Sequence, residues 1–87
     1  MIWQEVELEK DIVLRTFGED IDPIELKWHR DDEDRTVVAI VESDWQIQLE
    51  NKLPVSLDVP VFIERGEWHR LIKGTGELKV KIIKSNG

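Results

Sequence analysis

Strict alternation of apolar and polar residues is the feature that most constrains the fold of this chain. It runs through residues 24–30, 45–50 and 78–82. Successive side chains of a β-strand point to opposite faces, so the alternation predicts half-buried strands with one face turned toward a core. No stretch shows convincing helical spacing, and residues 5–14, which come nearest to it, fit two short strands better. The sequence therefore predicts an all-β protein.

Two further segments predict strands of a different kind. Residues 37–41 are continuously apolar and mostly β-branched, which favours a strand covered on both faces. Residues 55–59 lie between Pro54 and Pro60. Because proline has no amide hydrogen to donate to a sheet, we expect this segment to be an edge strand or a loop-like strand.

Turn-forming residues separate these segments at intervals typical of sandwiches and barrels. The candidate turns are residues 18–20, 31–34, 43–44, 51–52, 65–66 and 74–76. The pattern predicts about eight or nine short strands in a single domain over residues 1–87. An antiparallel chain of this kind closes into a barrel or a two-sheet jelly roll, because either arrangement hides its strand edges.

Composition narrows the classes of partner. The 87 residues carry 19 acids against 12 bases, for a net charge of −7, so we expect no nucleic-acid partner. Cysteine is absent, which excludes disulfides and thiolate metal sites. No apolar run approaches the roughly 18 residues of a membrane span. The acidic, alternating N-terminus is unlike a secretory signal, so we expect a cytoplasmic protein with no membrane partner.

The tripeptide Trp-His-Arg occurs twice, at residues 28–30 and 68–70, and these copies hold both histidines of the chain. On strands, the two tryptophans would face one side and the two histidines the other. The surrounding residues do not match, so this is not an internal repeat. We expect Trp28, Trp45 and Trp68 in the core, with stacking on a ligand such as a sugar or base as the alternative role, for which Trp45 is our candidate.

The second Trp-His-Arg segment resembles a motif of the cupin superfamily, G-x5-P-x-G-x2-H-x3-N. Residues 62–70 match this motif, with Gly66 and His69 at its Gly-x-x-His spacing. Glu64 stands where proline is usual, and the closing asparagine is absent.

The first Trp-His-Arg segment resembles the other cupin motif, G-x5-H-x-H-x3,4-E-x6-G. His29 takes the first histidine position, Asp31 the second, Arg35 the position of the glutamate ligand and Ser43 that of the closing glycine. The resemblance covers about residues 24–83. It implies a small cupin-like antiparallel β-barrel of the jelly-roll type, with a ligand pocket lined by the strands that carry both motifs.

The resemblance also implies a metal site formed by His29, Asp31 and His69. Two histidines and one carboxylate suit Fe(II), and are acceptable to Mn, Ni or Zn. Arg35 argues against a metal, because a guanidinium cannot be a ligand and repels a dication. It suits an anionic ligand instead, or it pairs with Asp31 or Asp34. One divalent metal and a metal-free pocket therefore stay open as alternatives.

Two classes of function fit these observations. The first is a cupin-like domain that binds a small molecule, with or without a metal; whether it is an enzyme stays open, because no nucleophile constellation is visible. The alternative is a non-enzymatic acidic interaction or regulatory protein that binds a protein partner. In either case the thin core and exposed strand edges favour a homodimer. A third possible function is that of a sensor in which ligand binding alters self-association.

Overall fold

The computed structural model describes residues 3–85, and over this part the chain forms two antiparallel sheets. The described strands are β1 (Trp3–Glu9), β2 (Ile12–Phe17), β3 (Asp34–Ala39), β4 (Gln46–Leu49), β5 (Val55–Ser56), β6 (Val61–Ile63), β7 (His69–Ile72) and β8 (Leu78–Ser85). A short 3-10 helix, η1 (Pro23–Glu25), is the one described helix. It is far too short to cross a membrane, and no helix in the described part meets that requirement. The all-β prediction is confirmed.

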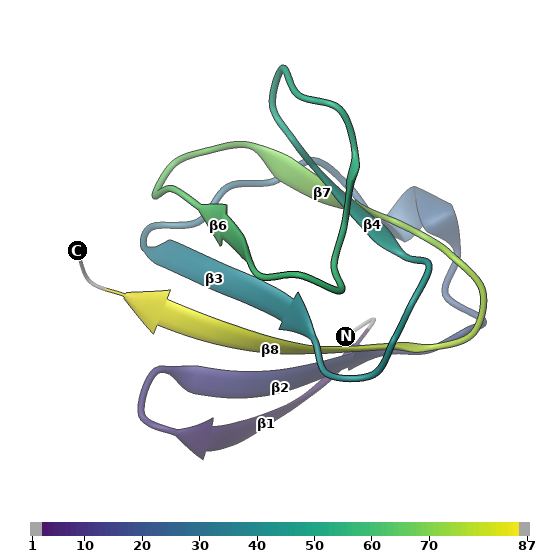
Figure 1. Cartoon of the computed structure of the whole chain (residues 1–87), viewed down its shortest axis with the longest axis horizontal. Helices are drawn as coiled ribbons and strands as arrows, with labels where there is room; N and C mark the ends of the chain where they lie inside the picture. The colour runs from purple at the N-terminus through teal and green to yellow at the C-terminus, as the bar shows by residue number, and fades with distance from the viewer. Residues whose placement is uncertain (1–2, 86–87) are drawn as a thin grey trace.

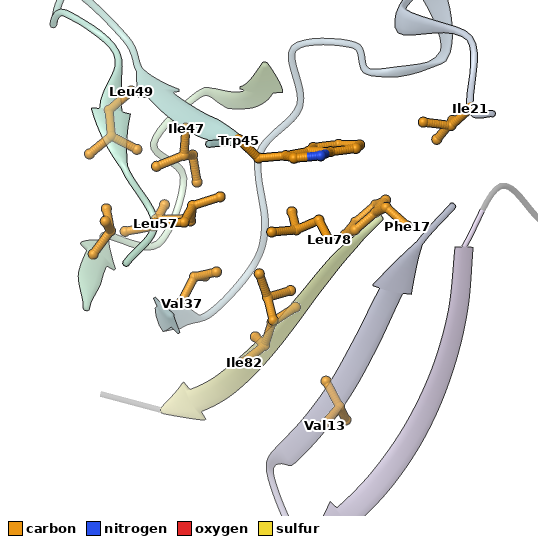
Figure 2. Packing of buried hydrophobic residues seen from close by; sticks show 13 residues of the cluster. Val13, Phe17, Ile21, Val37, Trp45, Ile47, Leu49, Leu57, Leu78 and Ile82 are labelled. Atoms are coloured by element: carbon orange, nitrogen blue, oxygen red, sulfur yellow. The ribbon is translucent and has the colours of Figure 1, made fainter. Parts of the chain in front are cut away.

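The two sheets face each other and enclose the core. One sheet has five strands in the order β1-β2-β8-β3-β6, and the other has three in the order β5-β4-β7. Figure 1 shows β1, β2, β8, β3 and β6 following one another upward from the bottom of the view, with β4 and β7 in its upper part. Two of the three alternating segments, residues 45–50 and 78–82, supply the core from their inward positions, which are Trp45, Ile47, Leu49, Leu78, Val80 and Ile82. Figure 2 shows the packing of this core and labels all of these side chains except Val80. Each such buried side chain contributes roughly 1.5–3 kcal/mol of hydrophobic stabilisation.

The prediction of a regular strand over residues 24–30 is wrong. Residues 23–25 instead form η1, and pairing is limited to a single bridge at His29. Pro23 occupies the start of the helical turn, and the Asp22 side chain accepts a hydrogen bond from the Ile24 amide at 3.0 Å. These two features favour a turn over an extended strand. Ile24 is consequently 72% exposed, although the alternation placed it on an inward face.

The expectation that residues 37–41 form a strand covered on both faces is also wrong. β3 ends at Ala39, and Ile40 and Val41 beyond it are at least half exposed. β3 lies between β8 and β6, so the opposing sheet covers only its inner face, where Val37 is buried. The predicted edge position of residues 55–59 agrees with β5, which lies at the edge of the three-stranded sheet.

Candidate functional site

The two Trp-His-Arg segments meet at a single antiparallel bridge. The backbone amide of His29 donates to the carbonyl of His69 at 3.0 Å, and the amide of His69 donates to the carbonyl of His29 at 2.9 Å. β7 pairs with β4 along its other edge. The bridge therefore carries residue 29 to the free edge of β7, and it brings the two imidazole rings to 4.2 Å between their centroids.

Each imidazole is oriented by a backbone carbonyl two residues earlier in the chain. The Nδ1 atom of His29 lies 3.1 Å from the carbonyl oxygen of Lys27, and Nδ1 of His69 lies 2.9 Å from that of Glu67. A carbonyl oxygen can only accept, so Nδ1 carries the proton in both rings. In the neutral imidazole this leaves a lone pair on Nε2, which is the usual arrangement in metal-binding histidines.

The Asp31 carboxylate faces His69 with one oxygen that lacks a hydrogen bond. Its Oδ2 atom is buried without a hydrogen-bond partner in the described part of the chain, yet it lies 3.2 Å from Nε2 of His69. When His69 is neutral, the Nε2 lone pair and Oδ2 oppose each other, and a bound cation would satisfy both atoms. His29, Asp31 and His69 each offer one ligand atom, all within 4.8 Å of one another. These residues therefore fit a divalent metal.

Asp31 is held in its ionised form. Burial by itself raises the pKa of this carboxyl, but the close contact with the His69 ring and the positive charge of Arg35 together lower it by more. The net result is a pKa below the ordinary value for aspartate. An ionised carboxylate is the form that binds a metal.

Arg35 contacts the other oxygen of Asp31 rather than the one that faces His69. Its Nη2 atom lies 3.4 Å from Oδ1 of Asp31 and 2.8 Å from Oε1 of Glu33. Its Nε atom donates to the same Glu33 oxygen at 2.9 Å. Of the two partners expected from the sequence, the structure shows Asp31; Asp34 instead accepts a hydrogen bond from the Arg65 amide at 2.8 Å. Sequence reasoning missed Glu33, although its spacing of two from Arg35 indicates a shared strand face.

A cavity of about 240 Å³ adjoins these residues. His29, Arg35 and His69 contribute to its wall, and apolar side chains of both sheets form most of the remainder, Phe17, Ile47, Leu71 and Ile82 among them. Arg15 also lines the cavity, and sequence reasoning missed it. The sequence did contain a signal for Arg15, because it lies two residues from each of Val13 and Phe17 and so shares their inward-facing side of β2.

The three tryptophans expected in the core differ in position. Trp45 is fully buried, donates from Nε1 to the Gly76 carbonyl at 3.1 Å and does not line the cavity, so it packs in the core rather than against a ligand there. Trp28 and Trp68 are 40% and 38% exposed, so the core prediction is wrong for both. Neither lies within a strand, and an arginine side chain covers each ring in part.

Comparison with known proteins adds information on the fold. No family model matches the sequence, and no curated protein matches it. Among solved structures, an RmlC-like cupin family protein with a double-stranded β-helix fold, from Methanocaldococcus jannaschii, has a TM-score of 0.69 to this chain. The two are 8% identical over 98% of this chain and 79% of the other.

Two larger proteins contain a similar domain. The structure of Fe(II)-HppE with the alternative substrate (S)-1-HPP has a TM-score of 0.64 at 16% identity, over 95% of this chain and 48% of that protein. A structure from work on the DMSP lyases RdDddP and RnDddQII has a TM-score of 0.69 at 14% identity, over 87% of this chain and 37% of that protein. The chain thus spans less than half the length of these two proteins. At such identities the likeness is one of fold, and the chain has a cupin-like fold of the double-stranded β-helix type.

Proposed function

We propose that this chain is a cupin-like binding domain that holds one divalent metal through His29, Asp31 and His69 and admits a small molecule to the adjoining cavity. The observation that carries the proposal is the buried Oδ2 atom of Asp31, which lacks a hydrogen-bond partner among the described residues and lies 3.2 Å from Nε2 of His69. Fe, Mn, Ni and Zn all accept this donor set. The Fe(II) form of the structurally similar HppE supports iron as one candidate.

The cavity limits the ligand to a small molecule. Its volume of about 240 Å³ lies below the roughly 300–1,000 Å³ of pockets that hold drug-sized ligands. A metal bound at its wall would act as a Lewis acid toward a ligand oxygen. The apolar side chains of both sheets would enclose the rest of the ligand and exclude water. No particular reaction follows from these features.

Metal analysis of the untagged protein tests this proposal. After loading with each of the four metals and removal of excess, we expect about one metal per chain in the wild type and a clear loss in His29→Ala, His69→Ala and Asp31→Asn. Asp32→Asn is the matched control, because Asp32 is an exposed neighbour outside the cluster. A wild type that retains none of the metals, or a His69→Ala variant that retains them fully, would remove the basis of the proposal.

A second candidate function, self-association, is favoured by the outer face of the five-stranded sheet. Pairing across the sheet aligns apolar residues on the face that points away from the core, where solvent-facing positions are ordinarily polar. These outer-face residues are Val6, Ile12, Leu14, Val38, Phe62 and Ile83. Val6 and Phe62 are 58% and 54% exposed, respectively.

The partner that we propose for this outer face is a second copy of the chain. The aligned rows contain Lys81 and Thr36 and a single acid, Glu9, which lies opposite Ile12. Two copies would therefore meet there with less repulsion than through the acidic surfaces of a chain of net charge −7. Sedimentation analysis is expected to show a dimer that Phe62→Glu weakens. Leu53→Glu, at an exposed apolar residue outside these rows, is the control. A wild type that is monomeric at all accessible concentrations would contradict the proposal.

A further inference from the structure

The charges around the proposed metal predict the class of ligand, an inference that rests on the proposed metal site. Asp31 and Glu33 supply two negative charges, and Arg35 supplies one positive charge. Bound between neutral histidines, a divalent metal would leave this cluster with one net positive charge. The side chains of Arg35, Asp31 and Glu33 are only 12%, 15% and 20% exposed, and a positive charge that is partly removed from water is costly unless it is paired. A ligand with one negative charge would therefore be favoured over a neutral one.

Arg35 is placed to share this ligand with the metal. Its side chain is largely buried and lines the cavity. Its recorded contacts to Glu33 and Asp31 use Nε and Nη2, and Nη1 takes part in none of them. Glu33 holds the guanidinium through two nitrogens, so the arginine is fixed before any ligand arrives. Charge-assisted hydrogen bonds from such a fixed guanidinium are roughly twice as strong as neutral ones.

The other arginine of the cavity is held by a glutamate in the same way, but it forms no ion pair with the proposed metal ligands. Arg15 donates from Nε to Oε1 of Glu5 at 2.8 Å, and its guanidinium lies 4.7 Å from the ring centroid of Trp3. Among the described residues its ion pair is with Glu5 alone, whereas Arg35 also contacts the proposed metal ligand Asp31. Arg15 therefore provides a matched internal control for Arg35.

We infer that the ligand of this site is a small monocarboxylate whose carboxylate balances the charge of the metal and Arg35 and whose apolar part enters the cavity. The apolar wall formed by Phe17, Ile47 and Leu71 favours a short hydrocarbon tail. Phosphate esters fit less well, because a charge of about −2 at neutral pH exceeds the single positive charge of the cluster.

Nuclear magnetic resonance titration of the zinc-loaded protein tests the inference with sodium butyrate and its neutral analogue butyramide. We expect butyrate to bind at least about tenfold more tightly, a difference of about 1.4 kcal/mol. Arg35→Gln is expected to abolish this preference while zinc stays bound, and Arg15→Gln to retain it. In the wild type, butyrate and not butyramide should shift the Arg35 side-chain resonance, a readout that requires no variant.

The possible outcomes distinguish a failure of the monocarboxylate inference from a failure of the proposed metal site. Zinc-loaded protein that binds butyrate no better than butyramide, or that binds neither, overturns the monocarboxylate inference and leaves the metal site intact. An Arg35 resonance that butyrate does not shift also overturns it. Protein that takes up no zinc overturns the metal site itself, and metal analysis before the titration identifies that case.

Discussion

His29 and His69 lie directly opposite each other and exchange both of their backbone hydrogen bonds, at 3.0 and 2.9 Å. The two Trp-His-Arg tripeptides therefore run antiparallel around this bridge, and each arginine lies over the tryptophan of the other tripeptide. The guanidinium carbon lies 4.8 Å from the ring centroid for Arg70 over Trp28 and 5.1 Å for Arg30 over Trp68. The repeated tripeptide of the sequence is thus a pairing of two segments, with the cation–π contacts on one side and both imidazoles on the other.

Metal binding at this bridge should stabilise the fold. At a zinc concentration of a hundred times the Kd, the gain is about 2.7 kcal/mol. For a domain of this size that gain raises Tm by roughly 10–20 °C. Thermal unfolding with and without zinc measures the shift. We expect His69→Ala to show none of it and Asp32→Asn to show all of it, and an equal shift in His69→Ala would locate the metal elsewhere.

Replacement of Trp45 should destabilise the core. Trp45→Phe removes the Nε1 hydrogen bond to the Gly76 carbonyl in a fully buried position, which costs about 1–3 kcal/mol. Trp45→Ala also leaves a cavity and costs about 3–5 kcal/mol. Urea unfolding measures both, with Trp68→Phe as the control because that ring is partly exposed. A Trp45→Phe protein as stable as the wild type would show that the hydrogen bond contributes nothing.

Gly74 should tolerate no side chain, because the turn packs against the start of β4. A Cβ atom there would lie 2.7 Å from the backbone nitrogen of Trp45 and 2.8 Å from the carbonyl carbon of Asp44. Gly74→Ala is therefore expected to cost about 1–3 kcal/mol through overpacking. Gly76→Ala separates this effect from backbone strain, because Gly76 has a φ of +70° and open space around it. For Gly76→Ala we expect a cost of about 1–2 kcal/mol from the left-handed conformation alone. A Gly74→Ala variant without measurable loss of stability would contradict the packing argument.

Asp44 should make the stability of this turn depend on pH. Its carboxylate accepts hydrogen bonds from the backbone amide of Thr75 at 2.8 Å and from the Thr75 hydroxyl at 2.9 Å. These bonds, the backbone one first, lower the pKa of Asp44 below its ordinary value. Because the unfolded chain then binds the proton more readily, the contribution of Asp44 is present above its unfolded pKa and is lost as pH falls through its folded pKa.

Urea unfolding across the acidic range tests this pH dependence. Asp44→Asn should be less stable than the wild type at neutral pH, and the difference should shrink as the wild-type carboxylate becomes protonated. Thr75→Val keeps the backbone donor and removes only the hydroxyl, so we expect an intermediate effect. A difference between wild type and Asp44→Asn that stays constant with pH would show that ionisation of Asp44 is irrelevant to stability.

The sequence by itself determined the fold class and two of the three strictly alternating strands. In residues 45–50 and 78–82 a shift of one residue would turn every apolar side chain toward solvent, so only one orientation buries them. The cupin resemblance of residues 62–70 depended on local spacing in the same way, and the solved structures confirm the cupin-like fold. Each of these features can be inferred from neighbours in the sequence.

Only the tertiary structure decided the details of the candidate site. His29 reaches β7 through one bridge at the end of an irregular segment, although alternation predicted a regular strand there. The sequence had singled out His29, Asp31 and His69, which form the cluster. Only the three-dimensional structure showed that Oδ2 of Asp31 lacks a hydrogen-bond partner among the described residues and that Glu33 pairs with Arg35. The physical reason is that a periodic pattern specifies which face a residue occupies, whereas a site depends on distances between segments that only packing brings together.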